Sequence, residues 1–332
     1  TVKVEAEGTT CWAYGADNSR YDYGKVINVS QHSTTNGASC PTTTPNYSEV
    51  YTYANNGNVQ TKTVNFEGKS YSSHTYYDDY QRVRSVVYPR LAVSVRNEYQ
   101  NGYLYKVLNN TSNDADFGKL LKQVSAVNAR GQATDVVYAN GVTEDRDFWS
   151  ESGLAYAFNV SGSNWYNNQT YTFNLIGSLS NRVMDISSTT GAQLLNEVFK
   201  YDGLNRVKSR TITGSDFVGF SMNESFGYDD AGNLLSKTGV SGAYNYTDTQ
   251  RPNRLKSIGS EYSFDYDENG NITSDGKRTH VYNSFDKPTL IHNGDTASTA
   301  TISAAFTYGP SRQVLKKVDT NNSKVTTTLY MG

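Results

Sequence analysis

A pattern of aromatic, polar and apolar positions recurs along the chain. In one copy Phe199 and Tyr201 stand two positions apart, a spacing that places both rings on one face of a strand. Asp202 opens the polar stretch that follows, and Asp is favoured at the first position of a type I turn. Asn205 tolerates a left-handed backbone, and Val207 then resumes the apolar alternation. The pattern therefore predicts a strand, a tight turn and a second strand, which together form a β-hairpin.

The same frame occurs seven times, and internal repeats are the strongest signal in the sequence. The tyrosine position is filled by Tyr53, Tyr77, Tyr201, Tyr228, Tyr266, Tyr282 and Tyr308. The next position holds Asp78, Asp202, Asp229, Asp267 and Asn283, with Ala54 and Gly309 in the other two copies. Three positions later stand Gly57, Gln81, Asn205, Gly232, Gly270, Asp286 and Arg312. We interpret the tyrosines as packing residues, because a lone hairpin is marginally stable and a row of hairpins can bury a continuous aromatic stripe.

These repeats predict an all-β fold, a long antiparallel array of β-hairpins. Residues 1–45 are expected to form N-terminal strands and a polar loop, with a degenerate repeat at 21–26. Residues 46–332 are expected to form one continuous array with no separate catalytic domain. Two turn signals, at 129–132 and 139–142, flank a short β-run, and 111–122 predicts a loop with at most one helical turn.

Composition agrees with a β-fold. The chain has 27 Tyr against 17 Leu, and Tyr suits strands, so we predict no helix of ordinary length. Lys and Arg are scattered and the net charge is −2, which disfavours a nucleic-acid partner. No apolar run is long enough to span a membrane. The chain opens on Thr1 with no signal peptide, so we expect a piece of a longer polypeptide.

The two cysteines, Cys11 and Cys40, flank a polar loop and are a candidate disulfide, which would imply an oxidising compartment. Two free thiols would instead indicate an intracellular chain. The histidines are His32, His74, His280 and His292. They are dispersed, so we expect neither a metal site nor a cofactor.

Catalytic motifs are not evident. Asp78-Asp79 and Asp229-Asp230 are paired carboxylates, but strand neighbours point to opposite faces and the first of each pair has a turn role. The segment 267–271 is faintly similar to a calcium loop and fails its glycine and glutamate positions. We therefore predict that the chain is not an enzyme.

At these repeated positions the chain resembles the Rhs/YD-repeat family, which includes shell-forming polymorphic toxins, toxin-complex proteins and teneurin-like proteins. The family's Tyr-Asp-x-x-Gly-Asn/Arg-Leu pattern is matched at 228–234 and 266–272, and a common variant at 201–207. Segments 128–132 and 140–144 are similar to a stretch that recurs ahead of the final repeats. Segments 306–310 and 327–332 are similar to the stretch before the Rhs-associated core. The resemblance covers nearly the whole chain and is weakest over 1–45.

The resemblance implies a function. In such proteins the hairpins pair into a long strip that coils into a hollow shell around a C-terminal toxin or effector. The implied partners are the remainder of the parent polypeptide and its cargo. The implied location is secreted or on the cell surface, by a bacterial extracellular or periplasmic route. The family's autoprotease belongs to the core domain beyond these repeats, so no catalytic residue is carried over to this chain.

Two alternatives differ in class. A secreted or surface-displayed carbohydrate-binding or adhesion module would bind a cell-surface glycan. It would require Trp12, Trp149 and Trp165 to be exposed in one groove. An enzyme such as a glycosidase or lyase would require two carboxylates meeting across a cleft.

Overall fold

The computed structural model describes residues 1–35, 39–89, 93–189, 191–214, 221–294 and 296–330. Within them the only helix is a short 3-10 turn, η1 (Asn18–Arg20), and the predicted all-β fold is confirmed. The chain divides into two compact units, the first comprising Thr1–Ser94 with Leu255–Gly332 and the second Val95–Arg254. No helix in the described residues is both long and apolar enough to cross a membrane.

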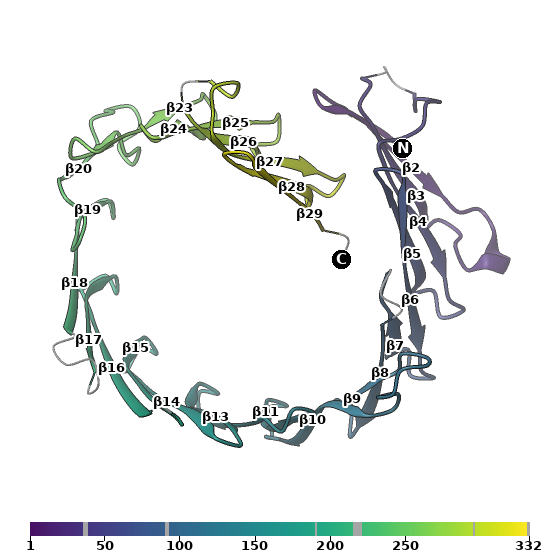
Figure 1. The fold of residues 1–332 in the computed structure, drawn as a ribbon, viewed down its shortest axis with the longest axis horizontal. Coiled ribbons are helices and arrows are strands. Elements are labelled where there is room, and N and C mark those ends of the chain that lie inside the picture. Colours follow the sequence, from purple (N-terminus) through teal and green to yellow (C-terminus); the bar gives the residue numbers. More distant parts are fainter. Residues whose placement is uncertain (36–38, 90–92, 190, 215–220, 295, 331–332) are drawn as a thin grey trace. The chain divides into compact units, whose positions relative to one another are not determined.

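The strands form three antiparallel sheets, and the described pairings join strands that follow one another along the chain (Figure 1). The first sheet contains β1 (Val2–Glu5), β2 (Gly8–Tyr14), β3 (Val26–His32), β4 (Tyr47–Tyr53), β5 (Val59–Phe66), β6 (Lys69–Tyr77), β7 (Val83–Val87), β8 (Ser94–Gln100), β9 (Tyr103–Asn109), β10 (Leu120–Val127), β11 (Ala133–Tyr138), β12 (Thr143–Phe148), β13 (Ala155–Gly162), β14 (Trp165–Phe173), β15 (Leu179–Ser188), β16 (Gly191–Tyr201), β17 (Val207–Gly214), β18 (Ser221–Tyr228) and β19 (Leu234–Lys237). The second contains β20 (Tyr244–Asn245), β21 (Ser257–Ile258) and β22 (Tyr262–Ser263). The third contains β23 (Asp265–Tyr266), β24 (Ile272–Ser274), β25 (Arg278–Tyr282), β26 (Pro288–Asn293), β27 (Ile302–Tyr308), β28 (Val314–Asn321) and β29 (Lys324–Leu329).

The repeated turn is held by its first residue. Asp202 N donates to Arg206 O at 2.9 Å, and Asn205 N donates to Asp202 O at 3.0 Å. The Asp202 carboxylate closes the loop, because its Oδ1 accepts from Leu204 N at 2.9 Å and from Arg206 N at 3.0 Å. The same two backbone bonds are made by turns that begin at Ala54, Asp78, Asn128, Asn174, Asp202, Asp229, Asp267, Asn283 and Gly309.

The third residue after each turn start has a left-handed backbone. The φ angles are 83° for Gly57, 63° for Gln81, 61° for Asn205, 91° for Gly232, 93° for Gly270, 60° for Asp286 and 62° for Arg312. A register shift accompanies the turn in each of these hairpins, as in hairpins whose turn ends in a left-handed residue. The turn therefore fixes the pairing of the two strands that it joins.

The tyrosine of each copy joins its hairpin to the hairpin before it. Tyr228 Oη donates at 2.9 Å to the carbonyl of Val207, the residue that resumes the second strand of the preceding copy. The equivalent bonds run from Tyr53 to Val26, Tyr77 to Val59, Tyr201 to Leu179, Tyr266 to Leu255, Tyr282 to Ile272 and Tyr308 to Pro288. The hydroxyl thus gives the tyrosine a role that packing alone would not require.

One further turn and one further tyrosine hydrogen bond were not predicted. Phe173 occupies the tyrosine position of a turn that begins at Asn174, and the carbonyl of Leu179 accepts the hydroxyl of Tyr201. In addition, Tyr246 Oη donates to Leu234 O at 3.1 Å. The array is therefore more regular than the sequence pattern indicates.

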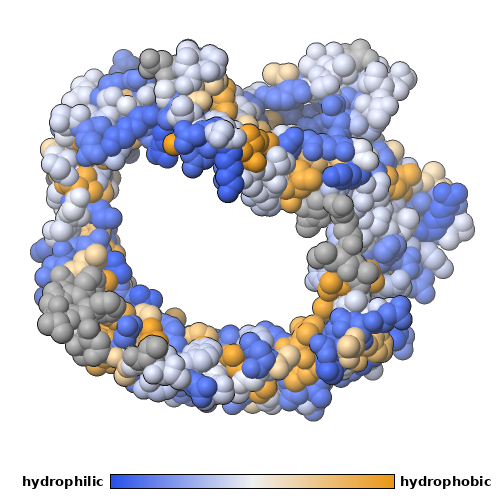
Figure 2. All heavy atoms as spheres, viewed as in Figure 1, coloured by the Kyte–Doolittle hydropathy of each residue, from blue (hydrophilic) through white to orange (hydrophobic). Residues whose placement is uncertain are grey.

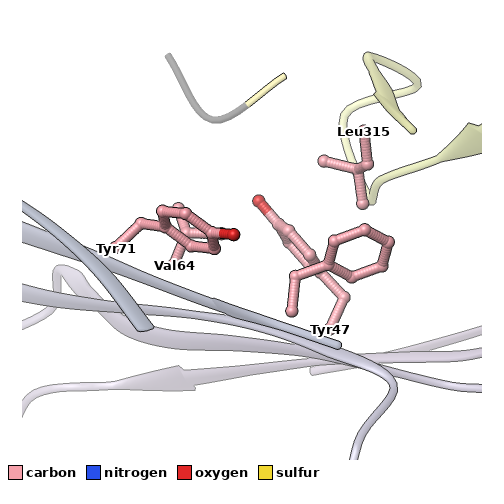
Figure 3. Packing of buried hydrophobic residues seen from close by; sticks show 5 residues of the cluster. Tyr47, Val64, Tyr71 and Leu315 are labelled. Atoms are coloured by element: carbon pink, nitrogen blue, oxygen red, sulfur yellow. The ribbon is translucent and has the colours of Figure 1, made fainter. Parts of the chain in front are cut away.

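Fully buried side chains are few, because most strand residues are half-buried on one sheet face or the other. The main apolar cluster lies in the first unit and consists of Tyr47, Val64, Phe66, Tyr71 and Leu315 (Figure 3). On the face drawn in Figure 2, hydrophobic residues form small patches separated by hydrophilic ones. Cys11 and Cys40 form a disulfide between the β2 strand and the loop after β3.

Replacing Gly232 with Ala should destabilise the second unit by about 1 kcal/mol, because an L-residue resists a left-handed backbone. Space is not the obstacle, since a Cβ at Gly232 would meet only Arg206 Nη1, at 3.9 Å. Gly203→Ala, in the neighbouring turn, is the control: a Cβ there has no neighbour within 4 Å and φ is not positive. Gly203→Ala should be neutral or slightly stabilising in urea unfolding. An equal loss of unfolding free energy in both variants would contradict the left-handed backbone assigned to Gly232.

Tyr201→Phe should cost about 1 kcal/mol in urea unfolding, because the Leu179 carbonyl loses its hydroxyl donor while the ring remains. Tyr23→Phe serves as the matched control, since the Tyr23 side chain is 67% exposed. The hydrogen-bond role of the tyrosine position would be rejected if the two variants behaved alike.

Candidate functional site: the tyrosine face of the second unit

Each sheet presents two faces, and the one that carries the repeated tyrosines is here called the tyrosine face. In the second unit, directly paired residues place Arg146, Phe158, Gln169, Met184 and Leu195 in one row across β12 to β16. Cross-strand partners share a face, and Leu195 stands six positions before Tyr201 on the same strand. This row therefore belongs to the tyrosine face.

An aromatic hollow lies on this face. Its volume is about 390 Å³, and it is lined by Arg146, Phe148, Ala155, Phe158, Tyr171 and Phe173. The guanidinium carbon of Arg146 lies 5.0 Å from the centroid of the Phe158 ring, and Arg146 also pairs with Glu144. Tyr171 Oη donates to Gln169 Oε1 at 2.8 Å. Apolar walls with a few fixed polar groups are suited to an apolar side chain of another polypeptide.

A ladder of alternating charge crosses the tyrosine face beside the hollow. It consists of Arg182, Glu197, Arg210, Glu224 and Lys237, one residue on each strand from β15 to β19. Arg182 Nη2 lies 2.6 Å from Glu197 Oε2, and Arg210 Nη1 lies 2.9 Å from Glu224 Oε2. Hydrogen bonds to Glu197 and then to Glu224 raise the pKa of Arg210 above its ordinary value. Because Glu197 is only 4% exposed, its two arginines are needed to compensate its charge.

The opposite face carries a group of aspartates on β11 and β12. Asp135 on β11 stands directly across from Asp145 on β12, and Asp147 follows two positions later on the same face. Burial, together with the charges of Asp147 and Asp135, raises the pKa of Asp145. In the described part of the chain, no group of three metal-ligating side chains is placed to hold a metal ion. The two faces of this sheet therefore differ in chemistry.

The turn aspartates are engaged inside their own loops. The backbone amide of Arg206, and then its guanidinium, hold the pKa of Asp202 below its usual range. The side-chain amide of Asn233 does the same for the pKa of Asp229, and that of Asn271 for the pKa of Asp267. In the 267–271 segment, Asp267 accepts from the backbone and side chain of Asn271, each at 2.8 Å. These carboxylates are placed to cap turns.

The tryptophans do not line one groove in the second unit. Trp149 and Trp165 are 51% and 41% exposed. Trp149 N donates to Leu154 O just before β13 begins, whereas Trp165 pairs with Gly162 where β13 ends. The two rings thus lie at opposite ends of an eight-residue strand, roughly 25 Å apart at the usual rise per residue.

The fold is shared with two solved structures. "Crystal Structure of TcdB2-TccC3-TEV" matches all of this chain with a TM-score of 0.71 at 12% identity. "Crystal Structure of TcdB2-TccC3 without hypervariable C-terminal region" matches 96% of it with a TM-score of 0.52, also at 12% identity. This chain spans about a fifth of those chains, 19% and 20% respectively. No family model and no curated protein matches the sequence. At this identity the likeness shows the fold alone, and the expected antiparallel hairpin array is confirmed.

Glu197→Ala should destabilise the second unit by about 2 kcal/mol, because it leaves two partly buried guanidinium groups without their carboxylate. The control is Asp265→Ala, whose pair with Lys256 is exposed on both sides and should contribute less than about 0.5 kcal/mol. Urea unfolding at low and high salt measures both variants. A Glu197→Ala effect no larger than that of Asp265→Ala would show that the ladder is not stabilising.

Proposed function

We propose that this chain belongs to the Rhs/YD-repeat family and forms part of the wall of a hollow shell that encloses a toxin or effector polypeptide, without a catalytic step of its own. The observation that carries the proposal is the repeated hairpin, joined to the preceding hairpin by a tyrosine hydroxyl, in a fold shared along its whole length with TcdB2-TccC3-TEV. The parent polypeptide supplies the remainder of the shell and the cargo.

The size of the sheet supports a wall. Each hairpin pairs with its sequence neighbours, so the array can be extended repeat by repeat without a thicker core. A twisted open sheet of more than about ten strands usually curls or splits, and this sheet has 19 strands. A curved single layer then has one face toward an enclosed space and one toward solvent.

The tyrosine face is the better candidate for the inner surface. In the first unit the same face already receives polypeptide, because Leu315 of β28 packs against Tyr47 and Phe66. In the second unit it carries the aromatic hollow and the charge ladder. Apolar and charged sites side by side suit contact with an extended or partly folded chain.

The disulfide supports the proposed location. A bond between Cys11 and Cys40 persists in an oxidising compartment, as expected for a secreted or surface-exposed protein. By contrast, the separation of Trp149 and Trp165 leaves the carbohydrate-binding alternative without the shared groove that it required.

Single-particle imaging of the parent polypeptide tests the proposal. We expect a hollow particle with internal density, in which residues 1–332 form part of the wall. A matched parent that lacks its C-terminal polypeptide should keep the shell and lose the internal density. A solid or rod-shaped parent without a lumen would overturn the proposal.

A further inference from the structure

The β27–β28 hairpin lies against the tyrosine face of β4 to β6 within the first unit. Leu315, on β28, is only 2% exposed and packs among Tyr47, Val64, Phe66 and Tyr71 (Figure 3). The rings of Tyr47 and Phe66 meet edge to face, with centroids 6.1 Å apart. Leu315 thus packs against side chains from strands that are far from it in the sequence.

Charged and polar contacts surround this apolar contact. Lys316 pairs with Glu67, 249 positions away in the chain, and Arg312 Nη2 lies 3.9 Å from Glu5 Oε1. Ser284 donates to Glu7 twice, from its backbone N and from its Oγ, each at 2.6 Å. The acceptors lie in or beside the turns after β1 and β5, and they face basic and hydroxyl groups from the third sheet. The contact is therefore complementary in charge as well as in shape.

The buried charge beside this contact is compensated without the hairpin. Beside Tyr47, the buried Glu49 carboxylate accepts from Tyr47 Oη at 2.5 Å and from Tyr51 Oη, and it lies 3.0 Å from Lys62 Nζ. All of these partners belong to β4 and β5. Removing Leu315 therefore does not leave the Glu49 charge uncompensated. The hairpin does make one polar contact here, because the side chain of Gln313, just before β28, hydrogen-bonds Tyr47.

Backbone pairing does not cross the contact. Among the described strands, β23 to β29 pair only with one another, whereas β4 to β6 belong to the 19-stranded sheet. β27 and β28 are paired from Ile302 to Tyr308, and β4 and β5 from Tyr47 to Tyr53. The two sheets can therefore separate by losing side-chain contacts alone, while the backbone hydrogen bonds within each sheet persist.

We propose that this contact is a seam that can open and close. Burial of Leu315 stabilises the closed state, and the ion pairs around it fix how the two sheets align. The seam has a docked and an undocked state, and both sheets stay folded in each. If the proposed function holds, the seam is a joint of the shell wall at which the wall can open. The geometry of the seam itself does not depend on that function.

A zero-length carbodiimide cross-linker tests the seam in the 332-residue chain, because it joins only amines and carboxylates that are in contact. We expect a Lys316–Glu67 cross-link, identified by mass spectrometry of peptides. Leu315→Asp should lower its yield about tenfold or more, because a carboxylate is costly to bury among apolar side chains. Leu315→Ala should give an intermediate loss, and hydrogen exchange should show β4 to β6 and β27 to β28 still protected in both variants.

Matched controls separate the outcomes. Val325→Asp, on the neighbouring strand β29 at a position 63% exposed, should leave the yield unchanged. Mixing isotope-labelled and unlabelled chains distinguishes bonds within one molecule from bonds between molecules. The seam is refuted if the wild type gives no intramolecular cross-link or if Leu315→Asp leaves the yield intact. It is equally refuted if Leu315→Asp removes exchange protection from either sheet. The experiment uses no cargo, so its result is independent of the imaging test.

Discussion

The hydrogen bond from each repeated tyrosine to the preceding hairpin is the constraint on which the array depends. It joins side chain to backbone, from Tyr228 to Val207 and from Tyr77 to Val59, so it sets the spacing of the hairpins that carry the tyrosine. The separation in sequence ranges from 10 to 27 residues. Loop inserts between repeats are tolerated, because only the tyrosine and its acceptor must be placed. Each repeat is thus built against its predecessor, as in other quasi-one-dimensional folds.

The turn and the tyrosine hydrogen bond of each copy favour the same register between the paired strands. In the Tyr201 copy, Asp202 holds the loop through the amides of Leu204 and Arg206, and the left-handed Asn205 sets the register shift next to the tyrosine. The carboxylate is ionised at neutral pH, because these donors hold the pKa of Asp202 below its usual range. Agreement between local turn chemistry and long-range hydrogen bonding is what allows one short motif to specify a large sheet.

The repeats were predictable from sequence because their signals are local, whereas the joints between distant strands were not. The turn at Asn174 was missed for two reasons. Phe173 lacks the tyrosine hydroxyl, and Leu175 and Ile176, although both are exposed, make the loop resemble an apolar strand in the sequence. The Arg182–Glu197–Arg210 ladder depends on strand register, which assigns partners only once the pairing is known. Leu315 looks like any strand residue, and the side chains that it packs against lie in strands that the sequence pattern does not relate to it.

A single-layer sheet with few fully buried side chains leaves both faces free to specialise. Stability comes from neighbour-to-neighbour contacts, so the tyrosine face of the second unit can carry a hollow and a charge ladder while the other face collects Asp135, Asp145 and Asp147. This dependence on contacts between neighbouring strands also explains the nature of the Leu315 contact. Where backbone pairing continues, strands cannot part without losing a ladder of hydrogen bonds. Among the described strands no such ladder joins the 19-stranded sheet to the seven-stranded sheet. Contacts of Leu315 and of charged side chains beside it join them instead.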